Sequence, residues 1–228
     1  MPQKIVWLNG SPKSDTESFS YKMIQYFTKA LKGHYDTFVE GNAFKLCQKN
    51  TLLEAHFREV LMADSLVIVS PLYADNMPSS VLDYLRSFEC FIKSHPELIT
   101  HPIKVYGFIN CGFLGGQQNH IALEILEHFA NRMHFIWGGG LGIGSGPMLA
   151  ATLESVPRES KMQQPIFAGL DSFIDALQSG TLIDTSHRQL LVTQNYLPSL
   201  FIISMNIAWT GMVGQNFHKL YNKPYKKS

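Results

Sequence analysis

Short apolar runs alternate with amphipathic stretches over most of this chain. The runs at 4–9, 65–70 and 103–109 are apolar at consecutive positions, as in parallel strands that are covered on both faces. Between them, apolar residues recur every three or four positions, which indicates helices. The predicted elements cover residues 4–9, 17–32, 35–46, 50–62, 65–70, 79–90, 103–109, 119–132, 134–143 and 159–179. This alternation predicts an α/β fold, a three-layer sandwich whose parallel strands are joined by right-handed crossovers.

The turn after the first predicted strand is rich in hydroxyl groups. Residues 9–18 read NGSPKSDTES, and a helical pattern with Met23, Ile24 and Phe27 on one face follows. The first N–H groups of a helix have no partner within the helix, and the helix dipole favours negative charge there. We therefore expect a phosphate at this turn. A serine that only caps the helix is the open alternative.

Spacing excludes two familiar phosphate loops. Gly10 is not followed by a second glycine and a lysine at the Walker A positions. The turn also carries a single glycine, whereas a dinucleotide fingerprint needs three. What remains is a hydroxyl-rich loop of the kind that flavodoxin-like proteins wrap around the single phosphate of FMN.

Two further loops follow predicted strands. The run at 65–70 leads into PLYADNMP at 71–78, where an aromatic ring and an amide lie between two stiffening prolines. Such a loop can hold a flat polar heterocycle. The run at 105–109 leads into the glycine-containing segment 110–117. All three loops lie at the carboxyl ends of predicted strands, where an open parallel sheet binds its ligand.

The segments NGSPKSDTES and ADSLVIVSPLYADNMPSSV together resemble the NADPH-dependent FMN reductase family, within the flavodoxin-like flavoproteins. The resemblance implies a five-stranded parallel sheet of order 2-1-3-4-5 with helices on both faces, in a domain over residues 1–180. It also implies non-covalent FMN, with NAD(P)H as co-substrate. The implied phosphate ligands are Ser11, Lys13, Ser14, Thr16 and Ser18. The implied ring contacts are Pro71, Leu72, Tyr73, Asn76 and Met77, with Cys111, Gly112 and Gly115 at the far edge.

The resemblance implies an FMN-dependent oxidoreductase that transfers hydride from NAD(P)H to a small acceptor: a quinone, a flavin, a nitro or azo compound, or iron. We expect no catalytic acid or base, because the cofactor carries the chemistry. One alternative is an FMN electron carrier that serves a protein partner. Flavodoxins are usually strongly acidic, whereas this chain has 19 basic and 18 acidic residues, which favours the enzyme. A protein of this fold that binds no flavin is a third possibility.

Two acidic residues depart from the family pattern. Glu17 stands where the family tends to have asparagine, and Asp15 lies nearby. Carboxylates near a phosphate weaken its binding unless they point to solvent. Cys111 has two interpretations as well, a reactive thiol beside the flavin or a small residue that packs behind the loop, and we favour the second.

Two other patterns have simpler explanations than a ligand site. His120, Glu124 and His128 share one helix face at metal-ligand spacing, but Ile121 and Leu126 on the opposite face predict that the polar face is simply solvated. We therefore predict no metal site. The glycines of 138–146 are not followed at once by a helical pattern, so we expect a flexible strand-end loop there.

Composition bounds the partners and the compartment. The balanced charge gives no basic surface for nucleic acid. Three widely spaced cysteines fit reduced thiols in the cytoplasm better than a disulfide framework. The first strand is expected to begin at residue 4, so we expect no signal peptide.

The segment 181–228 is expected to be a helical extension that packs on the domain or on a second subunit. No charged residue lies between Arg188 and His218. Polar residues interrupt this apolar stretch before it reaches the length of about 20 residues that a membrane span needs, so a membrane role is disfavoured. A helical stripe runs along it at Leu197, Phe201, Met205, Ala208 and Met212. We expect a homodimer.

Overall fold

The computed structural model describes residues 3–13, 18–153, 155–183 and 188–214. The chain divides into two compact units, Met1–Gln194 and Asn195–Ser228. The first unit holds the sheet and the second holds one long helix, and the two are described separately below.

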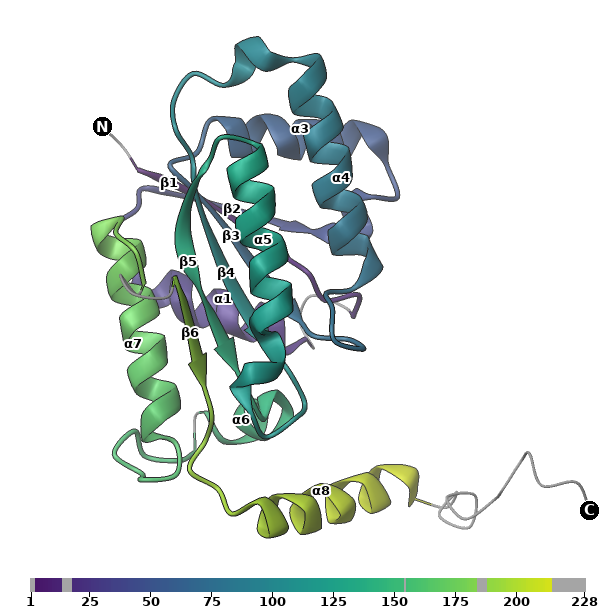
Figure 1. Cartoon of the computed structure of the whole chain (residues 1–228), viewed down its shortest axis with the longest axis vertical. Coiled ribbons are helices and arrows are strands. Elements are labelled where there is room, and N and C mark those ends of the chain that lie inside the picture. Colours follow the sequence, from purple (N-terminus) through teal and green to yellow (C-terminus); the bar gives the residue numbers. More distant parts are fainter. Residues whose placement is uncertain (1–2, 14–17, 154, 184–187, 215–228) are drawn as a thin grey trace, which may run out of the picture. The chain divides into compact units, whose positions relative to one another are not determined.

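Within the described residues, six strands form one parallel sheet of order β2-β1-β3-β4-β5-β6 (Figure 1). The predicted α/β class and the order of the first five strands are confirmed. The strands are β1 (Lys4–Asn9), β2 (Thr37–Asn42), β3 (Ser65–Pro71), β4 (Lys104–Asn110), β5 (Ile136–Ile143) and β6 (Gln189–Val192).

The sixth strand corrects the predicted strand count of five. β6 pairs with β5 from Gly140 to Ile143 and therefore forms an edge strand of the sheet. Its short apolar run, Gln189–Val192, has no periodicity that marks a strand, and it becomes one because β5 has a free edge beside it. The sheet-bearing unit thus runs to Gln194, past the predicted boundary at 180. Packing of the remaining segment on the domain or a second subunit stays a prediction.

Helices cover both faces of the sheet (Figure 1). Alternate strand residues such as Val6 and Ile68 face the helices α3, α4 and α5, whereas Trp7 and Val67 face α1, α6 and α7. Both faces are therefore dry, which explains the unbroken apolar runs of the strands. The helices of this unit are α1 (Phe19–Ala30), α2 (Ala43–Leu46), α3 (Asn50–Leu61), α4 (Ser79–Ser94), α5 (His120–Arg132), α6 (Gly146–Thr152) and α7 (Gln164–Ser179), with short 3₁₀ turns η1 (Pro96–Leu98) and η2 (Gly116–Asn119).

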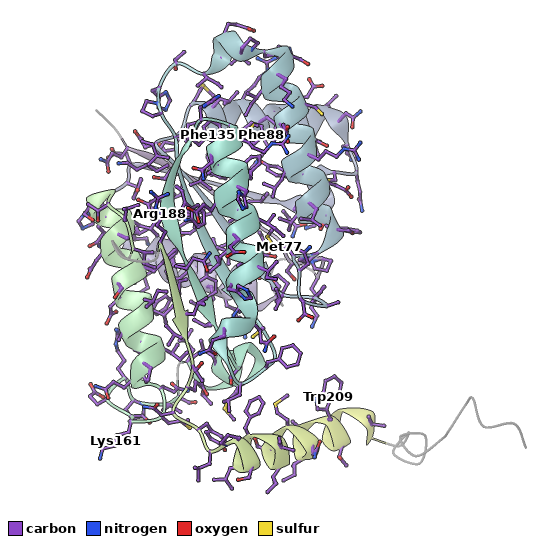
Figure 2. The ribbon with its side chains drawn as sticks, in the orientation of Figure 1. Met77, Phe88, Phe135, Lys161, Arg188 and Trp209 are labelled. Carbon is purple, nitrogen blue, oxygen red and sulfur yellow. The ribbon has the colours of Figure 1, made fainter. Side chains whose placement is uncertain are left out.

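Aromatic side chains fill much of the core on the α3–α5 side. The rings of Phe57 and Phe88 stack with centroids 4.7 Å apart. Phe88 also lies 6.2 Å from Phe135, and Figure 2 labels these two side chains next to each other. Rings in such offset and tilted contacts contribute about 1 kcal/mol per pair beyond the area that they bury.

The glycines of β5 correct the expectation of a flexible loop. Most of this glycine run lies within the strand itself, and only residues 144–146 fall beyond it. A Cβ on Gly140 would lie 2.4 Å from the Leu123 side chain, so glycine here allows α5 to pack closely on the sheet. The glycines therefore serve packing.

The predicted polar face of α5 is confirmed as exposed. His120, Glu124 and His128 are all solvent-exposed, although Ile121, expected in the core, is also 46% exposed. Within the described residues, no three His, Cys, Asp or Glu side chains are grouped as metal ligands would be.

The second unit contains α8 (Pro198–Val213), a helix without a charged residue. Its apolar side chains are exposed on several sides, among them Ile203 at 53%, Ile207 at 68% and Trp209 at 61% (Figure 2). In the described part of the chain, no helix has both the length and the apolar character that crossing a membrane requires. Helices that are apolar all round are usually covered by something else.

His56 is a buried titratable group on α3. Its Nδ1 lies 2.8 Å from the Tyr84 hydroxyl, and its Nε2 has no hydrogen-bond partner among the described residues. The ring is 6% exposed. Burial disfavours the charged imidazolium and lowers the pKa of His56 to about 4, against a smaller opposing effect of the Glu59 carboxylate.

We predict that this histidine makes the protein acid-sensitive. The unfolded chain binds a proton at His56 below pH 6.5, whereas the folded chain binds one only near pH 4. This contribution to stability is therefore complete above pH 7 and is lost as the pH falls, by about 3 kcal/mol at about 1.4 kcal/mol per pKa unit. Urea unfolding from pH 7 to pH 4 should show this loss in the wild type and not in His56→Gln.

The matched exchange at exposed His128 should leave the pH dependence unchanged. A wild type and a His56→Gln variant with parallel pH profiles would contradict the prediction. If His56→Gln fails to fold, an NMR titration of the His56 ring in the wild type decides the matter directly.

Candidate functional site

Three strands of the sheet end side by side, and their loops share one edge (Figure 1). Asn9 pairs with Val69 at the ends of β1 and β3, and the Gly10 N–H donates to the Val69 carbonyl at 2.8 Å. Pro71 and Asn110 pair at the ends of β3 and β4. The three loops predicted to form the site are therefore neighbours, because parallel strands deliver their carboxyl ends to one edge.

Side-chain amides hold the turn after β1. The Asn9 Oδ1 accepts a hydrogen bond from the Ser11 N–H at 3.0 Å, and the Asn42 Nδ2 donates to the Ser11 carbonyl at 2.9 Å. The Ser11 Oγ accepts from the Lys13 N–H at 3.3 Å. Ser11 is buried in this arrangement, whereas the Lys13 side chain is exposed. The hydrogen bonds of this turn thus centre on Ser11, and the Lys13 ammonium is exposed to solvent.

Asn9 leaves one polar atom without a partner. Its side chain is fully buried at the end of β1, and its Nδ2 has no hydrogen-bond acceptor among the described residues. A buried donor without an acceptor is costly, and such groups usually meet water or a ligand. The donor lies directly before the hydroxyl-rich turn.

Ser18 caps α1. Its Oγ accepts from the Tyr21 N–H at 3.1 Å, and its side chain is 2% exposed. Ser18 thus caps the helix, and its hydroxyl proton still offers a donor. The predicted ligands Ser14 and Thr16, and the acidic Asp15 and Glu17, lie outside the described residues.

The loop after β3 is a tight turn that presents an aromatic ring. The Tyr73 N–H donates to the Asn76 carbonyl at 2.6 Å, and the Asn76 N–H donates back to the Tyr73 carbonyl at 3.1 Å. Ala74 and Asp75 between them have left-handed backbone conformations with φ of 47° and 63°. The turn is closed on itself, and the Tyr73 side chain is left 46% exposed.

The other predicted ring contacts divide into surface and core. Pro71 and Asn76 are half-buried at the edge, and the Asn76 Oδ1 accepts from the Met77 N–H at 2.7 Å. Leu72 and Met77 are 8% and 3% exposed and pack in the core on the α3–α5 side, so their side chains support the loop from the core. Figure 2 labels Met77.

The loop after β4 is tied to the connection between β5 and α6. The Cys111 N–H donates to the Ile143 carbonyl at 3.1 Å, and the Gly146 N–H donates to the Cys111 carbonyl at 2.8 Å. The Ser145 N–H donates to the Phe113 carbonyl at 2.6 Å. Hydrogen bonds to the β5–α6 connection thus hold the backbone of this loop at Cys111 and at Phe113. The loop leaves the N–H groups of Gly112, Leu114 and Gly115 without acceptors among the described residues.

Cys111 packs behind this loop. Its side chain is 2% exposed, and its thiol donates to the Phe113 and Gly115 carbonyls at 3.7 and 3.5 Å. Burial raises the pKa of Cys111, and hydrogen bonds from the surroundings, including the Asn119 amide, oppose this rise. The thiol is therefore protonated at neutral pH and is a poor nucleophile. The packing interpretation holds for this cysteine.

Several polar residues of the edge were missed in the sequence. Asn119 is fully buried and donates to the Gly116 and Ile143 carbonyls at 2.9 and 3.0 Å. Ser145 is fully buried with a φ of 59° and an Oγ that has no partner among the described residues. Asn9 could have been suspected, because it ends the apolar run of residues 5–8. Asn42 follows Glu40 and Gly41 and carries no such signal. Asn119 and Ser145 carry no comparable signal.

A separate hollow of about 580 Å³ lies between α3 and α4 and involves none of these loops. Its floor is apolar and its rim mixes both charge signs, so it offers no convergent set of donors. We therefore take the strand-end loops as the candidate site. The hollow is lined by Cys47, Asn50, Leu53, Glu54, Phe57, Asp83, Arg86, Ser87, Cys90, Phe91, Ser94 and His95.

Comparison with solved structures gives the fold, while sequence comparison gives no match. No protein-family model matches the chain, and no curated protein sequence matches it. An NADH:FMN oxidoreductase is 15% identical with a TM-score of 0.56, covering 87% of this chain and 98% of its own. An NADPH-quinone reductase from P. pentosaceus is 14% identical with a TM-score of 0.52, covering 76% and 98%.

A third solved structure contains a flavin. An FMN-dependent NADH-azoreductase from Bacillus anthracis, in complex with FMN, is 15% identical with a TM-score of 0.50, covering 77% of this chain and all of its own. These likenesses confirm the predicted flavodoxin-like fold. At such low identity they establish the fold alone.

We predict that the loop after β4 depends on a glycine in the β5–α6 connection. A Cβ on Gly144 would lie 2.0 Å from the Leu114 carbonyl oxygen, a backbone atom that cannot yield. Gly144→Ala should therefore lower the free energy of unfolding by about 2 kcal/mol or more, as overpacking does. Gly112→Ala is the matched control, because a Cβ there meets nothing within 4 Å, and it should change stability by less than about 0.5 kcal/mol. Urea unfolding measures both, and equal effects would contradict the prediction.

Proposed function

We propose that this protein is an FMN-dependent oxidoreductase that transfers hydride from NAD(P)H to a small acceptor. One observation carries the proposal: three adjacent strand-end loops bring a hydroxyl-rich turn, an exposed tyrosine and a row of unpaired N–H groups to one edge. In that order, these features suit the phosphate of FMN, its flat ring system and the carbonyl-bearing edge of that ring. The residues present fit the group.

The phosphate would lie in the turn after β1. The Lys13 ammonium supplies the positive charge, and the Ser11 and Ser18 hydroxyls lie at the two ends of the turn, with Ser14 and Thr16 between them in the sequence. The start of α1 adds its dipole and unpaired N–H groups. The unpaired Asn9 Nδ2 is a further donor at the inner side.

The ring system would lie between the loops after β3 and β4. Tyr73 offers its exposed ring as one wall, and Pro71 and Asn76 complete that side. The N–H groups of Gly112 and Gly115 have no acceptor within the described residues, so they can donate to the carbonyl-bearing edge. Leu72, Met77 and Cys111 fix the loops from the core side.

When bound, FMN supplies the redox chemistry, accepting a hydride from NAD(P)H and returning two electrons to an acceptor. In the net reaction with a quinone, NAD(P)H, a proton and the quinone give NAD(P)⁺ and the hydroquinone. With ferricyanide, NAD(P)H and two ferricyanide ions give NAD(P)⁺, a proton and two ferrocyanide ions. The chain's own residues bind and orient these partners, and the proton comes from solvent at the open edge. The protonated Cys111 thiol takes no covalent part.

The comparisons support the proposal at the level of the fold. Three solved structures with this fold are described as an NADH:FMN oxidoreductase, an NADPH-quinone reductase and an FMN-dependent NADH-azoreductase. The activities in these descriptions share a nicotinamide donor and differ in the acceptor. The proposal therefore leaves the acceptor as a class.

The absorbance spectrum and NAD(P)H turnover test the function. We expect purified chain to retain added FMN through gel filtration, with flavin absorbance bands, and to oxidise NADH or NADPH with menadione or ferricyanide as acceptor. A chain that retains FMN but oxidises neither nucleotide is an electron carrier. A chain that does not retain FMN contradicts the proposal.

We further propose that the protein is a cytoplasmic homodimer that pairs through α8. The helix is uncharged and its apolar side chains are exposed on several sides, so a second copy can cover it without desolvating an ion. The thiols of Cys47, Cys90 and Cys111 are free, which fits a reducing compartment.

The oligomeric state tests this role of α8. Light scattering after gel filtration should give twice the mass of one chain, and Ile203→Glu should give a monomer because it places a charge on the apolar helix. Asn206→Glu, at an exposed polar position of the same helix, is the matched control and should stay dimeric. A monomeric wild type at tens of micromolar, or one that sediments with lipid vesicles, would contradict the proposal.

A further inference from the structure

We propose that Phe113 forms an aromatic wall of the acceptor site and selects planar aromatic acceptors, such as quinones and azo compounds, over inorganic iron complexes. This inference rests on the proposed function and narrows its acceptor class. The proposal rests on one observation: the exposed Phe113 side chain belongs to a backbone segment that hydrogen bonds hold in place.

The Phe113 side chain is 57% exposed and belongs to neither core cluster. It stacks on no other aromatic ring among the described residues. Most large apolar side chains of the first unit are buried, so an exposed phenylalanine at the candidate site stands out. An exposed apolar ring beside polar backbone groups is a common feature of ligand sites.

The backbone beneath this ring is fixed. The Phe113 carbonyl accepts from the Ser145 N–H at 2.6 Å and from the Cys111 thiol at 3.7 Å. The Gly116 N–H, at the far end of the loop, donates to the Thr193 Oγ1 at 2.9 Å. A ring on such a backbone loses little conformational entropy when a ligand stacks on it, which is the advantage of a preorganised wall.

The position of the loop puts Phe113 at the flavin edge. The loop leaves β4 beside the end of β3, where the Leu72 N–H donates to the Asn110 carbonyl at 2.7 Å and leads into the Tyr73 turn. Tyr73 and Phe113 thus belong to loops of neighbouring strands, and both rings are about half exposed. With the FMN ring against Tyr73, a flat acceptor stacked on that ring could contact Phe113 and gain aromatic contacts that an octahedral iron complex cannot make.

The test compares two acceptors in four forms of the FMN-loaded protein: wild type, Phe113→Ala, Phe113→Tyr and Ile136→Ala. Ile136 is the matched control, since it is 44% exposed but opens β5 at the opposite edge of the sheet. We expect Phe113→Ala to lower kcat/KM for menadione about fivefold more than for ferricyanide, in line with the size of aromatic pair energies. Phe113→Tyr should restore the ratio, and Ile136→Ala should not change it.

Two further measurements separate the possible roles. Titration of FMN should show the same affinity in Phe113→Ala as in the wild type within about twofold, and calorimetric titration of menadione should show weaker binding. Equal losses with both acceptors, weakened FMN binding, or no change would overturn the inference.

Failure of the proposed function gives a different result. A wild type that retains no FMN, or that oxidises no NAD(P)H, contradicts that function before any variant is compared. Menadione calorimetry on the FMN-free chain then decides the inference by itself. Binding that Phe113→Ala weakens and Phe113→Tyr restores supports the aromatic wall, and binding that is equal in all four forms overturns it.

Discussion

Parallel pairing of β1, β3 and β4 is the constraint on which the rest of the structure depends. Parallel strands must be joined by crossovers, and the crossovers here cover both faces of the sheet, so no face is left for a ligand. The carboxyl edge is where loops of different strands meet in the open. The hydroxyl-rich turn, the Tyr73 turn and the loop after β4 are neighbours for this reason alone.

Backbone N–H and C=O groups of the loops form much of this edge, and buried asparagine side chains hold them in position. Asn9, Asn42, Asn110 and Asn119 each hydrogen-bond to a loop or strand-end backbone group. A side-chain amide can satisfy a backbone carbonyl or N–H where the ladder ends, which the buried rim of a sheet requires. Rigidity of the loops follows from these contacts, and with it the fixed placement of the unpaired N–H groups and of the Phe113 ring.

Much of the architecture followed from periodicity. The strands and main helices of the first unit lie within a few residues of their predicted bounds, because dry strands need unbroken apolar runs and surface helices need one apolar stripe. β6 did not follow, since a four-residue run becomes a strand only when a free sheet edge accepts it. The glycines of β5 also led to a wrong prediction of a flexible loop, because the absence of a side chain at Gly140 makes room for Leu123.

The sequence by itself determined the α/β class, the order of the first five strands through its family resemblance, and the three loops that meet at the edge. These depend on local patterns of apolar, hydroxyl and turn-forming residues. Only the tertiary structure decided that Ser18 caps α1, that Leu72, Met77 and Cys111 face inward, and that Phe113 remains exposed on a fixed loop. The physical reason is that burial and hydrogen bonding depend on neighbours from distant strands, such as the Ser145 N–H that holds the Phe113 carbonyl.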